Sequence, residues 1–271
     1  MGKNKSIGFI GAGNMGRAII KGLLSAGTYS PSNLIVSDYS ESVIRDLSTS
    51  FPGIQTSSNN LNPTAASVVI LAIKPQDYEN AVRGIKDRIQ PETIVVTIAA
   101  GLSIEKIANW LDHDAKIVRA MPNMPALVLE GMTALCRNRQ VNNAEFQTVR
   151  EIFDAVGKCI ILSESLMNSY TALAGSGPAW ILVLIEALAD GAVREGISRT
   201  VAYEVAAQVL AGSARLVSET ALHPAVLKDK ICSPGGTTIE AIASLESAGF
   251  RSAVIQAVSA STARARELSN E

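Results

Sequence analysis

The chain has 271 residues, of which 47 % are hydrophobic and 18 % are charged. That composition supports one or two compact domains with substantial cores and excludes a disordered chain. The 24 basic and 25 acidic residues nearly cancel, so the charge gives no reason to expect nucleic acid or an anionic membrane as a partner. We therefore expect the protein to act on a small-molecule substrate.

The three cysteines are widely spaced and form no CxxC pair. This pattern is typical of free thiols in a reducing compartment, so we expect a cytoplasmic protein. The first six residues match an N-myristoylation pattern and residues 18–26 resemble a signal-peptide core, but Lys21 and a glycine-rich motif interrupt that segment. No run approaches the roughly 18 apolar residues of a membrane span, so we expect no membrane partner.

Up to about residue 164, short β-branched runs alternate with helical patterns, which predicts an α/β Rossmann domain with a doubly wound, mostly parallel sheet. Ser103 is the expected N-cap of a helix over 104–111, and Gly157 is expected to close a helix over 144–156. The expected strands are Ser6–Ile10, Leu34–Ser37, Val68–Ala72, Ile94–Ile98, Lys116–Arg119, Met132–Cys136 and Lys158–Leu162.

From residue 165 onward no convincing strand follows, so residues 165–271 are predicted to form an all-α domain. Pro178 suits the first turn of a helix that runs to about Arg194 and stops at Gly196, and Ser198 can cap the next helix. Gly249 separates two further helices. The expected domains are therefore 1–164, which binds a dinucleotide, and 165–271.

The helix around Trp180–Ala189 is apolar nearly all round, with Glu186 as its one charge over 181–189. More than one of its faces must therefore be buried. A domain of about 105 residues has difficulty covering so much surface by itself. We expect a homodimer of interlocked helical domains, which could assemble into a larger homo-oligomer. The alternative is that the N-terminal domain covers the helix.

A strand over 7–10 runs directly into the motif GxGxxG and then into a helical pattern over 17–26. In that context Gly11 permits a tight turn, Gly13 lets the backbone approach a pyrophosphate, and Gly16 lets the helix pack on the strand. The motif therefore predicts a dinucleotide site rather than a purely structural turn.

Asp38 follows the second strand at the spacing of the acid that binds the ribose hydroxyls of NAD. Ser37 and Ser40 flank it and could hydrogen-bond a 2′-phosphate, so the choice between NADH and NADPH stays open.

Three further loops follow successive strands, and each is a weak signal by itself. Lys74 precedes Pro75, small residues occupy 98–101, and Asn123 stands between two prolines, which would present its amide to a ligand. Because the carboxyl ends of parallel strands share one sheet edge, a nicotinamide cleft explains all three together.

The run Ser233-Pro234-Gly235-Gly236-Thr237-Thr238 precedes an apolar helical pattern. Two glycines before a helix start can form a cluster of backbone N–H groups that binds a carboxylate or phosphate. The alternative is a capping box between Thr237 and Glu240, which leaves the doubled glycine unexplained.

Classical catalytic groups are missing from the sequence. His113 and His223 are expected to be solvated or capping residues, no metal site is expected, and no Ser-His-Asp arrangement is visible. The helix after Gly175-Ser176-Gly177 contains no lysine or histidine that could serve a dehydrogenase as acid or base.

Over nearly its whole length the chain resembles pyrroline-5-carboxylate reductases. The resemblance is carried by the Gly8–Gly16 motif, Lys74-Pro75, Ala174-Gly175-Ser176-Gly177-Pro178-Ala179, Leu227-Lys228-Asp229, and Ser233–Ile239. It implies reduction of 1-pyrroline-5-carboxylate to L-proline with NADPH or NADH, at the end of proline biosynthesis, by an oligomer of helix-swapped dimers.

The resemblance also implies roles for individual residues. The substrate would contact Glu164, Gly235, Gly236, Thr237 and Thr238, with Thr238 orienting the ring nitrogen; Lys230 occupies a position whose role stays open. The cofactor would contact Gly11, Ala12, Gly13, Asn14, Met15, Gly16, Ser37, Asn60 (or Asn59), Ala72, Lys74, Pro75, Ala99 and Ala100.

A protonated cyclic imine is already electrophilic, which accounts for the missing acid–base group. Two rival functions remain. A β-hydroxyacid dehydrogenase would need a lysine in the helix after residue 177, and residues 166–190 contain none. A non-catalytic nucleotide sensor would bind NAD(P)H without turnover.

Overall fold

A computed structural model describes residues 6–112 and 114–270 of the chain. Contacts divide the chain into two compact units, one formed by residues up to Gly175 together with those after Ser261, the other by Ser176–Ser261. The division falls later than the expected boundary at 164/165. Buried Met167 explains the difference, because it belongs to the core of the first unit.

The end of the chain also belongs to the first unit, which the sequence reading did not anticipate. The Ser269 hydroxyl donates a hydrogen bond to Asn168 Oδ1 at 3.1 Å. The backbone of Leu268 lies close to Gly101, whose φ is +77°. The last turns of the final helix are therefore held by groups in the first unit.

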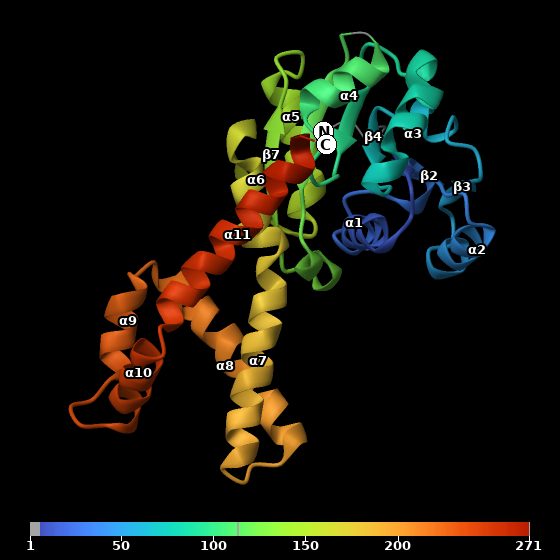
Figure 1. Cartoon of the computed structure of the whole chain (residues 1–271). Coiled ribbons are helices and arrows are strands. Elements are labelled where there is room, and N and C mark those ends of the chain that lie inside the picture. Colours follow the sequence, from blue (N-terminus) through green and yellow to red (C-terminus); the bar gives the residue numbers. More distant parts are fainter. Residues whose placement is uncertain (1–5, 113, 271) are drawn as a thin grey trace. The chain divides into compact units, whose positions relative to one another are not determined.

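The first unit is built on one eight-stranded sheet in the order β3-β2-β1-β4-β5-β6-β7-β8 (Figure 1). Adjacent strands are parallel except for β6 and β7, which are antiparallel. The doubly wound, mostly parallel sheet is thus confirmed. The strands are β1 (Ile7–Ile10), β2 (Leu34–Ser37), β3 (Gln55–Ser57), β4 (Val68–Leu71), β5 (Ile94–Thr97), β6 (Lys116–Met121), β7 (Gly131–Arg137) and β8 (Gly157–Ile161).

The sequence reading missed β3, for a physical reason. Its three residues, Gln55–Ser57, are polar and none is fully buried, so they lack the apolar run that marks a central strand. By contrast, β1, β4 and β5 are buried along their whole length, as expected for parallel strands covered on both faces.

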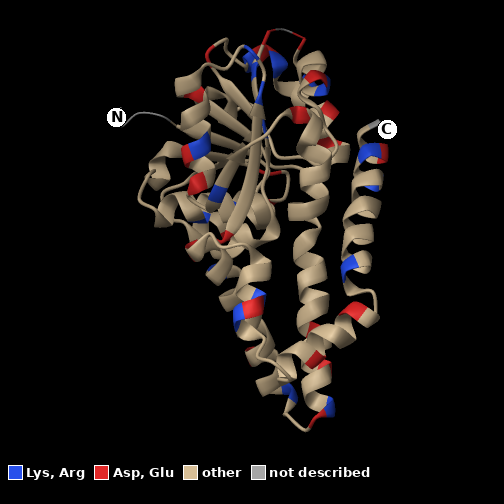
Figure 2. Ribbon diagram, turned by 90° about the vertical axis from the view of Figure 1, so that its left-hand side faces the viewer, with Lys and Arg blue, Asp and Glu red and all other residues tan. Residues whose placement is uncertain are grey.

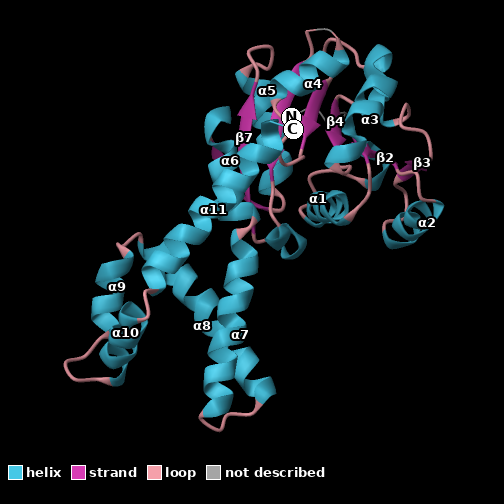
Figure 3. Cartoon of the chain, viewed as in Figure 1, coloured by secondary structure: helices cyan, strands magenta, loops and turns pink. Residues whose placement is uncertain are grey.

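Helices cover both faces of the sheet and form two cores (Figure 3). Helices α1 (Asn14–Ser25), α2 (Glu41–Ser50) and α5 (Asn143–Asp154) pack on one face, and α3 (Tyr78–Ile85) and α4 (Ile104–Leu111) pack on the other. The Ser103 hydroxyl accepts from the N–H of Lys106, which confirms it as the cap of α4. Gly157 does not close α5 as expected, because it opens β8.

The second unit is all helical. It comprises α7 (Gly177–Arg194), α8 (Arg199–Thr220), α9 (Pro224–Ile231), α10 (Thr237–Ser247) and the first part of α11 (Phe250–Asn270), and the short α6 (Met167–Tyr170) precedes it in the first unit. Gly196 and Gly249 have positive φ values of 97° and 74°, which confirms the expected helix ends at both glycines.

Helix α7 leaves large apolar side chains exposed in the single chain, among them Leu182 (64 %) and Val183 (63 %). Long stretches of the second unit's helices carry neither acidic nor basic residues (Figure 2). The helical stretch Glu164–Arg194 is long and apolar enough to cross a membrane by length and composition, with 11 % of its most apolar window buried. The expectation that no run reaches that threshold is therefore wrong.

Two glycines within helices provide a matched test of the packing in the first unit. A Cβ at Gly22 in α1 would lie 2.4 Å from Val156 Cγ1, whereas a Cβ at Gly84 in α3 would meet nothing within 4 Å. We expect Gly22→Ala to lower the free energy of unfolding by about 1–3 kcal/mol through overpacking. Gly84→Ala should raise it by about 0.5–1 kcal/mol through helix propensity. Urea titration measures both, and equal effects would contradict this packing.

Candidate functional site

A cavity of about 910 Å³ lies beside the carboxyl ends of β1, β2 and β4. The order of the sheet reverses between β1 and β4, and such switch points are where open α/β sheets bind ligands. The cavity is lined by Gly11, Gly13, Asn14, Met15, Asp38, Tyr39, Ser40, Val43, Asn60, Ala72, Ile73, Lys74, Asp77, Asn80 and Ala81.

The loop after β1 is shaped by glycines with two different tasks. Gly11 has a φ of +95°, and a Cβ there would lie 2.5 Å from the carbonyl oxygen of Ala72. A Cβ at Gly16 would lie 2.8 Å from the carbonyl oxygen of Gly11. Gly13 is exposed, and a Cβ there would meet no protein atom within 4 Å. Gly11 and Gly16 are therefore needed for packing, while Gly13 leaves space open on the ligand side.

Helix α1 begins at Asn14, directly after this loop. The N–H groups of a first helical turn have no partner inside the helix, and the positive end of the helix dipole lies there. The cavity wall at Gly13–Met15 can therefore bind a phosphate.

Asp38 is fixed at the end of β2 by two backbone groups. Its Oδ2 accepts from the N–H of Ala12 at 2.9 Å, and its Oδ1 accepts from the N–H of Ser40 at 2.9 Å. The residue is 9 % exposed and lines the cavity. A carboxylate in a single orientation therefore stands beside the glycine loop.

Ser37, which was expected to contact the cofactor, is fully buried. Its hydroxyl donates to Asn60 Oδ1 at 2.8 Å, and its carbonyl oxygen accepts from the N–H of Gly11 at 2.8 Å. Of the two asparagines considered, Asn60 lines the cavity and Asn59 is not among its lining residues. Ser37 thus holds the loop and Asn60 in place from behind the cavity wall.

The ends of β4 and β5 are joined by the buried hydroxyl of Tyr78. It donates to the carbonyl oxygen of Leu71 and accepts from the N–H of Ile98 at 3.3 Å. Burial raises the pKa of Tyr78 to about 12, so this donor stays protonated across the physiological range. The hydroxyl fixes the start of the loop that contains Ala99 and Ala100.

The residues expected on the nicotinamide side are only partly brought together. Ala72 and Lys74 line the cavity. Pro75 is exposed, Ala99 is buried at 4 % exposure and Ala100 is exposed, and none of the three lines the cavity.

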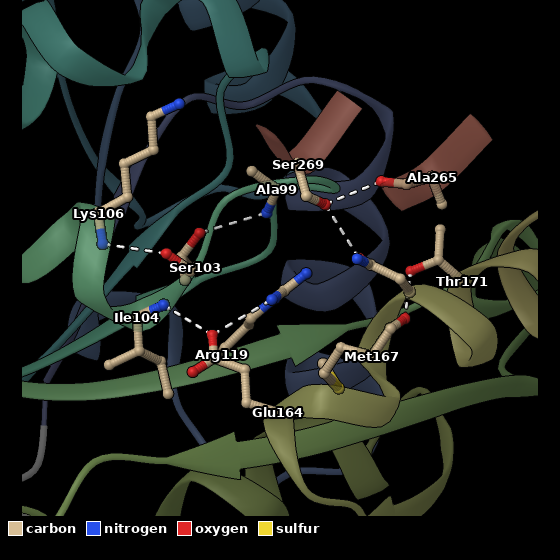
Figure 4. A network of polar contacts seen from close by, with 12 residues as sticks. Ala99, Ser103, Ile104, Lys106, Arg119, Glu164, Met167, Thr171, Ala265 and Ser269 are labelled. Carbon is tan, nitrogen blue, oxygen red and sulfur yellow. Dashed lines mark hydrogen bonds and ion pairs between the residues drawn. The ribbon is translucent and has the colours of Figure 1, made fainter. Parts of the chain in front are cut away.

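The side chain of Glu164 is anchored by two groups from different elements (Figure 4). Its Oε1 accepts from the N–H of Ile104 at 2.7 Å and from Arg119 Nη1 at 3.2 Å. The Arg119 side chain is 5 % exposed and that of Glu164 is 36 % exposed. Among the described residues, Nε and Nη2 of Arg119 have no hydrogen-bond partner, so this carboxylate is the principal counter-charge of a buried guanidinium.

In the second unit, the run before α10 forms a tight turn. The N–H of Gly236 donates to the carbonyl oxygen of Ser233 at 3.1 Å, and Gly235 has a φ of +65°, as in a type II turn with proline at its second position. Gly236 caps α10 without a side-chain hydrogen bond, and Thr237 is the first residue of the helix. The capping box of Thr237 with Glu240 is therefore not formed, which favours the anion-site interpretation.

The expectations for Asn123, His223 and His113 have different outcomes. Asn123 does not present its amide to a ligand, because its Nδ2 donates to the carbonyl oxygen of Ala174 and its Oδ1 accepts from the N–H of Met132. His223 caps α9 through Nδ1, as expected. His113 lies outside the described residues. Within 6–112 and 114–270, no group of three or more His, Cys, Asp or Glu side chains could hold a metal ion.

The sequence reading missed several residues that line the cavity, namely Tyr39, Val43, Ile73, Asp77, Asn80 and Ala81. Asp77, Asn80 and Ala81 follow Lys74 at intervals of three, three and one residues, which is the spacing of one helix face. That spacing could have predicted that these residues lie on the same side of the cavity as Lys74.

Comparison with known proteins gives two family matches along the chain. Residues 164–268 match the model described as pyrroline-5-carboxylate reductase dimerisation. Residues 6–101 match the model described as NADP oxidoreductase, coenzyme F420-dependent.

Full-length relatives and solved structures are also similar. A pyrroline-5-carboxylate reductase of Methanosarcina acetivorans is 41 % identical over 98 % of both chains. The structure of a pyrroline-5-carboxylate reductase from Coxiella burnetii is 36 % identical, with a TM-score of 0.93 over 98 % of this chain and 99 % of that one. That of the Plasmodium falciparum pyrroline carboxylate reductase with NADP bound is 30 % identical, with a TM-score of 0.88 over 98 % and 99 %.

We expect Gly13→Ala to weaken dinucleotide binding while leaving the free energy of unfolding nearly unchanged. The added methyl group meets no protein atom, so it can only occupy space on the ligand side. Dissociation constants from the quenching of protein fluorescence by NADH and NADPH, together with a urea titration, test this. Unchanged binding would contradict a pyrophosphate at Gly13.

Removing the carboxylate of Glu164 should destabilise the first unit. We expect Glu164→Ala to lower the free energy of unfolding by about 1.5–3 kcal/mol, because it leaves the buried Arg119 without its charged hydrogen-bond acceptor. Glu164→Gln keeps a carbonyl oxygen for the N–H of Ile104 and should lose less. Thermal unfolding measures the difference, and equal stability of Glu164→Ala and the parent would show that the ion pair contributes nothing.

Proposed function

The chain belongs to the pyrroline-5-carboxylate reductase family, and from this premise we propose that it reduces 1-pyrroline-5-carboxylate to L-proline with a hydride from NADPH or NADH. This is the final step of proline biosynthesis. The proposal includes a cytoplasmic location, which three unpaired cysteines favour.

One observation carries the proposal. Each unit contains a glycine-containing loop directly before a helix, and the N–H groups at such a helix N-terminus can bind an anion. In the first unit it is the loop Gly11–Gly16 before α1, and in the second it is the turn Ser233–Gly236 before α10. A dinucleotide brings a pyrophosphate and the substrate brings a carboxylate, so the two sites match the two anionic groups that have to be bound.

The cofactor would be held in the cavity at the switch point of the sheet. The proposed contacts that line this cavity are Gly11, Gly13, Asn14, Met15, Asn60, Ala72 and Lys74. Ala12, Gly16 and Ser37 would act through the geometry of the loop, and Pro75, Ala99 and Ala100 would lie toward the nicotinamide.

The substrate carboxylate would be bound by the N–H groups of Gly235 and Thr237. Gly236 would contribute by shaping the turn, because its own N–H donates to the carbonyl oxygen of Ser233. Thr238, the second residue of α10, would hydrogen-bond the ring nitrogen. Within the first unit, Glu164 is a further proposed contact of the substrate. Glu164 is suited to this because it is held by Ile104 and Arg119 yet remains 36 % exposed. Lys230 is exposed on α9, and we assign it no role.

The reaction needs little acid–base chemistry from the protein. Bound NAD(P)H supplies the hydride, and the imine carbon accepts it while the protonated ring nitrogen becomes the amine of proline. The residues then have to hold both reactants in reacting geometry, an effect that can contribute on the order of 7–11 kcal/mol to lowering the barrier.

We propose that the active form is a homodimer, which can assemble further. The apolar side chains left exposed on α7, such as Leu182 and Val183, lie within the segment that matches the family's dimerisation model. A second copy of the chain, rather than lipid, would cover the apolar stretch Glu164–Arg194.

Two rival functions are distinguished by one optical assay of NADH and NADPH. Oxidation of either with pyrroline-5-carboxylate supports the proposal. Reduction of NAD(P)+ with 3-hydroxyisobutyrate would instead indicate a β-hydroxyacid dehydrogenase, and binding without turnover of either substrate would indicate a nucleotide sensor.

We expect Thr238→Val to lower kcat/KM for pyrroline-5-carboxylate at least tenfold, because the loss of one hydrogen bond to a charged group is worth about 1.5–3 kcal/mol. The dissociation constant of NAD(P)H should not change. Thr200→Val is the matched control, since Thr200 is also the second residue of a helix, α8, and it should leave kcat/KM intact. Unchanged kcat/KM in Thr238→Val would refute the role of Thr238.

A further inference from the structure

The end of β2 carries a negative charge that faces the cavity. Asp38 lines the cavity at the point where the second strand of the sheet ends. In Rossmann folds an acidic residue at this point accepts hydrogen bonds from the ribose hydroxyls of NAD, whereas a 2′-phosphate needs a cation nearby.

The orientation of this carboxylate is fixed by hydrogen bonds within the chain. Both of its oxygens accept backbone N–H groups, one from Ala12 in the glycine loop and one from Ser40. Because these bonds favour the present orientation, Asp38 cannot turn aside for a 2′-phosphate without giving up two hydrogen bonds. One of them also holds the loop that would bind the pyrophosphate.

The basic side chains around Asp38 do little to offset the negative charge of a 2′-phosphate, because they are paired with other groups or do not line the cavity. Helix α1 carries two basic residues, Arg17 and Lys21. Lys21 does not line the cavity, and the Nε, Nη1 and Nη2 of Arg17 donate to Ala12, Asp46 and Val43 respectively. Arg45 on α2 forms an ion pair with Glu41 at 3.6 Å.

In the part of the chain that the structure describes, Lys74 is the one basic residue that lines the cavity, and it follows β4 rather than β2. The second acid of the lining, Asp77, follows it by three residues. The described residues at the β2 end of the cavity therefore combine a fixed carboxylate with neutral Tyr39 and Ser40.

We propose that Asp38 is the residue that determines cofactor choice in this chain and that it selects NADH over NADPH. The inference deepens the proposed function by naming the cofactor of the same site. The reductase from Plasmodium falciparum has NADP bound, so the family is not confined to NADH, and the preference has to come from residues of the individual chain.

Direct binding tests the proposal without any reduction of substrate. Dissociation constants of NADH and NADPH are measured on the full chain by nicotinamide fluorescence, with no imine present. We expect NADH to bind about 10- to 100-fold more tightly, because the 2′-phosphate adds nearly two negative charges close to a carboxylate. NADPH binding as tightly as NADH, or more tightly, would overturn the proposal.

Asp38→Asn removes the charge and keeps the size of the side chain. It should reduce the NADH preference at least tenfold, chiefly by improving NADPH binding. Glu41→Gln is the matched control, since Glu41 is an acid in the first turn of α2 but does not line the cavity, and it should change the ratio less than about twofold, as expected of a screened surface charge. An unchanged ratio in Asp38→Asn would overturn the proposal.

Tyr39→Arg provides a second test that leaves the hydrogen bonds of Asp38 untouched. Tyr39 is 88 % exposed and lines the cavity, so an arginine there can reach a 2′-phosphate without disturbing the core. NADPH affinity should rise while NADH affinity changes little, and no gain for NADPH would overturn the proposal. These ratios are independent of the imine assay, so the cofactor inference can fail while the reductase function stands, and the reverse.

Discussion

The structure of the first unit depends on how closely the loop after β1 approaches its two neighbouring strands. The N–H of Gly11 donates to Ser37 and that of Ala12 donates to Asp38, while Gly11 lies so close to Ala72 that no side chain fits between them. Three strand ends are thereby held together at the point where the sheet order reverses. This fixes the start of α1, and with it the N–H groups that can bind a phosphate. A chain without glycine at position 11 could not make this approach.

Hydrogen bonds of buried side chains also hold the carboxyl ends of the strands in place. Tyr78 joins the ends of β4 and β5 through its hydroxyl, and burial raises the pKa of that group to about 12. Arg119 and Glu164 connect β6 to the start of α4. Because reaction by positioning requires that the reactants be held within a narrow range of geometry, such rigid supports are what a site without an acid–base group needs. The second unit has a different task. Its apolar helices offer a surface that a second copy of the chain can cover.

Periodicity and motif context predicted the elements whose signal is local. Seven of the strands, the cap at Ser103, and the helix ends at Gly196 and Gly249 depend on residues close together in the chain, and all are present. The strand β3 was missed because Gln55–Ser57 is polar and is defined by its pairing with β2. The chain's return to the first unit after Ser261 was missed for a similar reason, since nothing in α11 itself marks Asn168 as its partner.

The sequence by itself determined the Rossmann architecture and the glycine loop after β1, because glycine spacing and strand hydrophobicity are properties of short segments. It indicated the family through resemblance, chiefly in motifs such as Ser233–Ile239. Only the tertiary structure decided which polar side chains face the cavity. In the folded chain the Ser37 hydroxyl donates to Asn60, and both the Nδ2 and the Oδ1 of Asn123 are hydrogen-bonded. The carboxylate of Asp38 lines the cavity. The physical reason is that a buried polar group has to find its partner among residues distant in sequence, and that pairing exists only once the strands lie side by side.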